Sequence, residues 1–128
     1  MKTLFDHDLT LEEAKELIKN GANVNEIDDI DHSTPIFNVT NIKIAKLLID
    51  NSAKMDIQNK NGEIALFYVS HPEIAELMIA HGADINHTTT YNNTVLHYAQ
   101  NHDMVTVYNN ISKSIHRLEY DLLNGTVR

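Results

Sequence analysis

The chain has 128 residues, of which 42% are apolar, 22% charged and 6% aromatic, and this composition excludes collagen-like, low-complexity and wholly disordered proteins. It contains no Cys, which excludes disulfides, thiol catalysis and Cys-based zinc sites, and no segment approaches the ~18 apolar residues of a membrane span. Its net charge of −8 without a basic cluster argues against nucleic acid and favours a basic protein partner. We therefore expect one soluble, cytoplasmic domain over residues 1–128, without membrane contact and monomeric when free.

An internal repeat of 30 or 31 residues runs through the chain. The aligned blocks are residues 13–22, 44–53 and 74–83, and again residues 34–39, 64–69 and 94–99. A repeat of this length is typical of solenoid proteins, in which each unit packs mainly on its neighbours. The four units that we expect cover residues 1–28, 29–58, 59–88 and 89–128.

The first three units each contain a stretch of about ten residues with apolar side chains at helical spacing. In the first unit, Thr10 begins a capping box with the glutamate three residues on, and Gly21 supplies the left-handed residue that ends the helix. In the third, Pro72 lies in the first helical turn and Gly82 follows the end, whereas Ser52 is a poorer residue for that position in the second. The core positions predicted by this spacing are Ala14, Leu17, Ile18, Ala45, Leu48, Ile49, Ala75, Met78 and Ile79.

A short apolar block precedes these helices, as in residues 35–39, and predicts a first helix of barely two turns. Clusters of Asn, Asp, Thr and Gly separate the units and predict exposed, hairpin-like turns. In the fourth unit no stop residue follows the second helix, and apolar residues keep helical spacing from Met104 to Leu122. We therefore expect one long helix, from about Asp103 to Asn124, that caps the end of the stack.

The repeated unit resembles the ankyrin repeat, a turn followed by two antiparallel helices. The resemblance is carried by Thr34-Pro35-Ile36-Phe37, Thr94-Val95-Leu96-His97-Tyr98-Ala99, Leu47-Leu48-Ile49-Asp50-Asn51-Ser52-Ala53, Gly82-Ala83-Asp84-Ile85-Asn86 and Gly21-Ala22-Asn23-Val24-Asn25. The units are shorter than the ~33 residues of the family, and the constant offset between motifs places the deletion near the end of the first helix. The resemblance implies an all-α ankyrin-repeat solenoid of four short repeats with hairpin-like turns and a long C-terminal capping helix. It also implies that His97 bonds to the backbone of a neighbouring hairpin.

Eight His residues raise the question of a metal site or of acid–base catalysis, but they include no HExxH motif and no pair four residues apart. The acids Asp28, Asp29 and Asp31 lack the Gly and Glu of a calcium loop. Ser33 next to His32 resembles a catalytic set only in residue type, because adjacent side chains point in different directions. We therefore expect no enzyme, no metal and no cofactor. A metal-dependent hydrolase built on the His residues is a separate hypothesis.

The resemblance implies a scaffold that docks a partner protein on a concave face formed by the hairpin tips and first helices. Carried over position by position, it implies the partner-binding residues Ile30, Asp31, Ser33, Lys60, Asn61, Glu63, Tyr68, Thr90, Tyr91, Asn93, Asn101 and His102. Tyr91 is the preferred central contact because Tyr combines a large contact area with a hydroxyl. A small acidic stack favours a cytoplasmic inhibitor or immunity protein that neutralises a basic toxin or enzyme. The alternative is an adaptor, or a secreted bacterial or viral effector that recruits host proteins.

Overall fold

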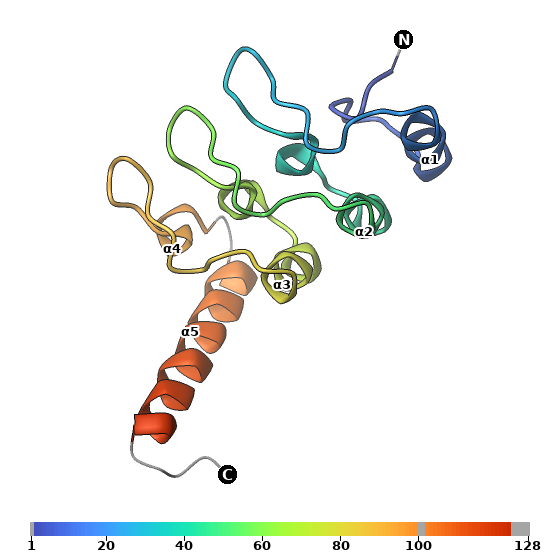
Figure 1. The fold of residues 1–128 in the computed structure, drawn as a ribbon. Helices are drawn as coiled ribbons and strands as arrows, with labels where there is room; N and C mark the ends of the chain where they lie inside the picture. The colour runs from blue at the N-terminus through green and yellow to red at the C-terminus, as the bar shows by residue number, and fades with distance from the viewer. Residues whose placement is uncertain (1, 100–101, 124–128) are drawn as a thin grey trace.

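The computed structural model describes residues 2–99 and 102–123, which form helices and loops without a strand (Figure 1). One row of helices packs in the order in which it occurs along the chain. It consists of α1 (Leu11–Lys19), α2 (Ile42–Asp50), α3 (Pro72–Ala80) and α5 (His102–Leu123). A second row consists of the short helices η1 (Pro35–Asn38), η2 (Ala65–Tyr68) and α4 (Val95–Tyr98). This arrangement confirms the predicted all-α solenoid.

Three hairpin-like loops project from the same side of the stack (Figure 1). Neighbouring hairpins are joined through their backbones, because the amide of Lys60 donates to the carbonyl of Asp31 at 2.9 Å and the amide of Thr90 donates to the carbonyl of Asn61 at 3.3 Å. A backbone hydrogen bond between two loops fixes the position of one loop against the next. The three loops therefore form one continuous surface.

The first helix of each unit is shorter than the two turns that we expected. The helices η1, η2 and α4 contain four residues each, and η1 and η2 are 3₁₀ turns. The residues after them have left the helical conformation: Val39 and Val69 are extended, with ψ of 134° and 132°, and Ala99 has a ψ of 123°. Val69 is buried and Val39 packs against the core, so the extended backbone after the helix directs these two valines toward the core. Each first helix thus ends where the sequence predicts the shortening of the repeat.

The predicted helix ends are confirmed. The hydroxyl of Thr10 accepts from the amide of Glu13 at 3.1 Å, and the Glu13 carboxylate accepts from the amide of Thr10 at 2.9 Å, which completes the capping box. Pro72 is the first residue of α3. The residues that follow α1, α2 and α3 have left-handed backbone, with φ of 97° at Gly21, 72° at Ser52 and 103° at Gly82.

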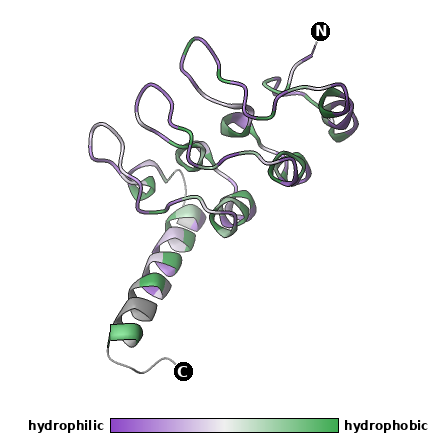
Figure 2. Cartoon of the chain, viewed as in Figure 1, coloured by the Kyte–Doolittle hydropathy of each residue, from purple (hydrophilic) through white to green (hydrophobic). Residues whose placement is uncertain are grey.

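The core lies between the two rows of helices, and the hairpins are mainly polar (Figure 2). Of the predicted core positions, the buried ones are Ala14, Ala45, Leu48, Ile49, Ala75 and Met78. Leu17, Ile18 and Ile79 are only half-buried, which corrects the prediction for these three. Leu17 and Ile18 lie on α1, which packs on α2 and has no helix on its other side among the described residues. Ile79 borders a shallow groove between α3 and α5.

The long C-terminal helix caps the stack with its N-terminal part, and Ile115 still packs against the core. Met104 and Tyr108 are fully buried, and the Tyr108 hydroxyl donates to the carbonyl of Leu66 at 3.3 Å. Burial raises the pKa of Tyr108 to about 12. The C-terminal end of α5, red in Figure 1, extends away from the stack, and Leu122 and Leu123 there are exposed. The predicted cap therefore covers less of the apolar stripe than we expected, and the predicted end at residue 124 lies outside the described residues.

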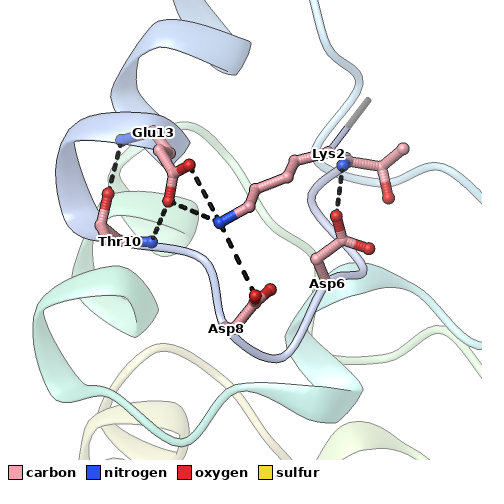
Figure 3. Close-up of polar contacts among 6 residues, drawn as sticks. Lys2, Asp6, Asp8, Thr10 and Glu13 are labelled. Carbon is pink, nitrogen blue, oxygen red and sulfur yellow. Dashed lines mark hydrogen bonds and ion pairs between the residues drawn. The ribbon is translucent and has the colours of Figure 1, made fainter.

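The first unit has turns in place of a first helix, and polar contacts hold them against α1. The ammonium of Lys2 lies 3.0 Å from the Glu13 carboxylate and 3.7 Å from that of Asp8, while the amide of Thr3 donates to Asp6 at 3.0 Å (Figure 3). The hydrogen bond to Glu13 raises the pKa of Lys2. The hydrogen bond from the Thr10 amide, followed by that from Lys2, lowers the pKa of Glu13. Charged groups thus face solvent at this end of the stack, as a terminal unit requires.

Candidate partner-binding surface

The predicted site residues divide into exposed side chains at the hairpin tips and buried side chains beneath them. The exposed ones, with Tyr68, define what we call the hairpin surface: Ile30, Asp31, Lys60, Asn61, Tyr68, Thr90 and Tyr91. Ile30 is 82% exposed and Tyr91 is 75% exposed, so each hairpin at an end of this surface presents one large apolar or aromatic side chain to solvent. Asn93 is half-buried. The hairpin surface thus combines large contact groups with hydrogen-bonding groups.

Ser33 and Glu63 are buried, with 5% and 4% of their surface exposed. Ser33 donates to the Asp31 carboxylate through both its hydroxyl, at 2.8 Å, and its amide, at 3.1 Å. These two hydrogen bonds lower the pKa of Asp31, the larger effect coming from the hydroxyl. Ser33 therefore supports a charged Asp31 at the hairpin tip, and its own side chain is directed to that residue.

Glu63 is a buried carboxylate held by neutral donors. Its Oε1 accepts from the Tyr68 hydroxyl at 2.5 Å and from the Asn59 amide group at 2.9 Å. Burial by itself would raise the pKa of Glu63, but hydrogen bonds from Tyr68, Asn59 and Tyr98 outweigh it and hold the pKa below its usual 4.5. Glu63 therefore carries its negative charge beneath the hairpin surface.

Tyr68 lies at the end of η2 and is 41% exposed. The rings of Tyr68 and Phe37 make an edge contact, with ring centres 5.5 Å apart and planes at 64°. This contact holds the Tyr68 ring in place. Burial, followed by the hydrogen bond to Glu63, raises the pKa of Tyr68 to about 12. The hydroxyl therefore stays protonated and donates to Glu63 while part of the ring faces solvent.

The structure adds Asn59 and Tyr98 to the site. Asn59 is buried, and its side-chain oxygen accepts from the amides of Asn61 and Glu63, both at 3.0 Å, which shapes the third hairpin. In the hairpin of the fourth unit, the hydroxyl of Thr89 accepts from the amides of Tyr91 and Asn93 in the same way. The repeat offers a signal for Tyr98, because it lies 30 positions after Tyr68. Of the other predicted contacts, Asn101 and the side chain of His102 lie outside the described residues.

The hydrogen bonds described for His97 lie within its own turn, where Nδ1 accepts from the amide of Thr94 at 3.0 Å. The bond from a His ring to a neighbouring hairpin is instead made by His87, whose Nε2 lies 2.8 Å from the carbonyl oxygen of Gly62. This corrects the predicted partner of His97. His87 takes the structural role because it lies beside the third hairpin, with its ring also against Phe67.

Over residues 2–99 and 102–123, no three or more His, Asp or Glu side chains are grouped to hold a metal ion. Within the same part of the chain, no helix has the length and apolar character needed to cross a membrane.

Residues 36–111 match the sequence model of a family described as ankyrin repeats, in three copies. The chain is an ankyrin-repeat protein. The match starts in η1 and ends in α5, so it covers more than half of the chain and leaves the first unit outside. A search of curated proteins finds no match. Ankyrin-repeat domains are typically non-catalytic modules that bind proteins, which makes the hairpin surface of this ankyrin-repeat protein its candidate site.

Proposed function

We propose that this ankyrin-repeat protein binds a basic partner protein on its hairpin surface and has no catalytic turnover of its own. The observation that carries the proposal is the pair of backbone hydrogen bonds that joins the three hairpins through Asp31, Lys60, Asn61 and Thr90. Loops joined in this way are already ordered before a partner arrives, so binding loses less conformational entropy than it would with independent loops. Their exposed side chains then act as one surface.

Charge supports the choice of a basic partner. The chain carries a net charge of −8, and the hairpin of the second unit contributes Asp28, Asp29 and Asp31. The carboxylate of Asp31 is kept charged by Ser33, and Glu63 adds a buried negative charge below the third hairpin. Complementary charge of this kind speeds association with a positively charged protein and selects against acidic ones.

We further propose that the protein is a cytoplasmic inhibitor or immunity protein that neutralises a basic toxin or enzyme and is monomeric when free. A small acidic surface suits this role because it can cover a basic active site or substrate groove. The absence of Cys is compatible with the reducing cytoplasm. The alternative is an adaptor or secreted effector that recruits host proteins. A toxin-like gene next to this one supports the inhibitor, and an isolated gene with a secretion signal supports the effector.

Affinity capture from native lysate, read by mass spectrometry, tests the proposal. The tagged full chain should capture a basic protein, and the Tyr91→Ala variant should capture much less of it. Glu76→Gln is the control, because Glu76 is exposed on α3, away from the hairpins. Capture of an acidic protein, or capture that depends on Glu76 and not on Tyr91, would contradict the proposal.

A further inference from the structure

One backbone hydrogen bond recurs between consecutive hairpins. The carbonyl of Asp31 accepts from an amide of the next hairpin at 2.9 Å, and the carbonyl of Asn61 does the same at 3.3 Å. The carbonyl of Tyr91 has this place in the fourth unit. The amide that would continue the series belongs to residue 120, which lies within α5, and the hairpin of the fourth unit is the last of the row (Figure 1). Among the hydrogen bonds of residues 2–99 and 102–123, none ends at the Tyr91 carbonyl.

An edge contact between aromatic rings recurs in the same way. Phe37 contacts Tyr68 of the third unit, with ring centres 5.5 Å apart. Phe67 contacts Tyr98 of the fourth unit, with ring centres 5.0 Å apart. His97 is the next member of this series, 30 positions after Phe67. It is exposed, whereas Phe37 and Phe67 are only 4% and 3% exposed.

The apolar residue before this ring is also uncovered in the fourth unit. Ile36 and Leu66 are each 1% exposed, but Leu96, at the same position, is 39% exposed. The short helices contact one another in chain order, η1 with η2 and η2 with α4, so among the described residues α4 has a short helix on one side only. We call the Tyr91 carbonyl, Leu96 and His97 the open end of the hairpin row.

The opposite end of the row is closed. The amide of Ile30 is the counterpart of the amides that link the later hairpins, and it donates to the Asp28 carboxylate at 2.6 Å. In front of it lie the turns of the first unit, with the paired charges of Lys2 and Asp8. A second copy of the chain therefore lacks a free counterpart amide with which to continue the row head to tail. The helix α5 also carries this chain away from the open end (Figure 1).

We infer that the open end binds a turn of the partner protein, which continues the row of hairpins. A backbone N–H of that turn donates to the Tyr91 carbonyl. An aromatic side chain beside it packs on Leu96 and His97, as Tyr98 packs on Phe67. The mode resembles the addition of a strand to a sheet edge, where main-chain bonds give affinity and side-chain contacts give specificity. This inference rests on the proposed function and adds to it the way in which the partner docks.

The basic protein captured by the full chain is the probe for two matched variants. Leu96→Glu should weaken its binding about tenfold, because a carboxylate replaces the apolar surface on which the partner packs. Leu122→Glu makes the same change at a leucine that is 65% exposed near the far end of α5, and should leave the affinity unchanged. Both variants add a negative charge, so a general attraction to a basic protein would strengthen binding in both.

The carbonyl carbon of Tyr91 gives a second readout, which a loss of stability would not produce. In the full chain labelled with carbon-13, its NMR signal should move downfield when the partner binds, as carbonyl signals do on accepting a hydrogen bond. The carbonyl of Leu66 already accepts from the Tyr108 hydroxyl in the core, so its signal should stay in place. If Leu96→Glu unfolds the chain, this comparison in the wild-type protein decides.

An unmoved Tyr91 carbonyl signal, or a folded Leu96→Glu variant that binds as tightly as Leu122→Glu, would overturn the open end as the docking site. The proposed function would still stand if capture depends on the Tyr91 side chain. A dimer of the free chain, seen by sedimentation and abolished by Leu96→Glu, would assign the open end to a second copy and overturn the inference. Capture of no basic protein that needs Tyr91 would contradict both the proposed function and the inference.

Discussion

A Cβ atom added to Gly62 would lie 2.8 Å from the hydroxyl oxygen of Thr90 in the next hairpin and 3.0 Å from its backbone nitrogen. The first distance is shorter than real Cβ contacts and the second is unusually tight, so a side chain at residue 62 would push the hairpins of the third and fourth units apart or displace Thr90. The same approach brings the carbonyl of Asn61 to the amide of Thr90 and that of Gly62 to the ring of His87. The fit of these two hairpins therefore depends on one glycine.

Replacing Gly62 by Ala should lower the free energy of unfolding by about 2–4 kcal/mol, from a φ of 75° that disfavours a side chain and from crowding against Thr90. Gly21→Ala is the matched control. Gly21 has a φ of 97°, but no atom lies within 4 Å of a Cβ added there. Gly21→Ala should therefore lower the free energy of unfolding by about 1–2 kcal/mol. Denaturant unfolding measures both. Equal losses would show that the contact between hairpins contributes nothing.

Leu48→Ala should destabilise the protein by about 2–5 kcal/mol, because Leu48 on α2 is 1% exposed and its truncation leaves a cavity between neighbouring units. Leu96→Ala, at a position that is 39% exposed, should cost clearly less. Thermal and denaturant unfolding give both values. A loss at Leu48 no larger than that at Leu96 would be incompatible with a core at this position.

Glu63→Gln should lower the free energy of unfolding by about 1–3 kcal/mol at pH 7, because the amide is a weaker acceptor for Tyr68 and Asn59 than the carboxylate. The pKa of Glu63 is lower in the folded protein than its usual 4.5, so its stabilising effect is present above pH 4.5. That effect is lost as the pH falls through the folded-state pKa, when the carboxylate takes up a proton. The difference between wild type and variant should therefore shrink in acid.

Unfolding of both proteins across pH 2–7 measures this difference. Glu76→Gln, a change of the same charge on the exposed face of α3, controls for the general effect of removing an acid. A Glu63 difference that stays constant with pH, or that Glu76→Gln reproduces, would show that the charge of Glu63 does not stabilise the fold.

Truncation within α5 should separate its two halves. A chain that ends at Asn110 loses Ile111 and Ile115, which pack against the core, and should aggregate or unfold with less cooperativity. A chain that ends at Arg117 keeps both residues and should melt close to the full chain, because the rest of the helix extends away from the stack (Figure 1). Light scattering and thermal unfolding test both chains. An unaltered melt of the shorter one would make residues 111–128 a separate interaction segment.

Binding kinetics measured with the captured partner should separate the effect of charge on association from the effect of direct contacts on dissociation. Higher salt should slow association, because it screens the electrostatic attraction that acts before the two proteins touch. Asp29→Asn and Asp31→Asn should slow association for the same reason, because they remove negative charge. Tyr91→Ala should instead speed dissociation and cost about 2 kcal/mol in affinity, as expected for a central aromatic contact that is 75% exposed in the free protein. Full affinity in all these variants, with losses at Lys46 or Glu76, would place the partner on the outer helices.

The features predicted from the sequence are those that depend on residues close together along the chain. The Thr10 capping box, the left-handed residue Gly21 and the burial of Leu48 follow from hydrogen bonds and helical spacing within one unit, and the unit recurs every 30 or 31 residues. The all-α solenoid follows in turn, because a repeated amphipathic unit buries its apolar face against the next one. The predicted partner-binding positions on the hairpins follow from the same alignment of the repeated units.

The tertiary structure decided which of those positions face solvent. Glu63 and Tyr91 occupy neighbouring hairpins in equally polar stretches of sequence, yet Glu63 is buried because Asn59 and Tyr68 close over it, while Tyr91 has no such cover. The apolar spacing on α5 likewise continues to Leu122, although Leu122 is exposed and the end of the helix extends away from the stack. Helical spacing records which side chains share a face, and only the packed neighbours determine how far along the helix that face is covered.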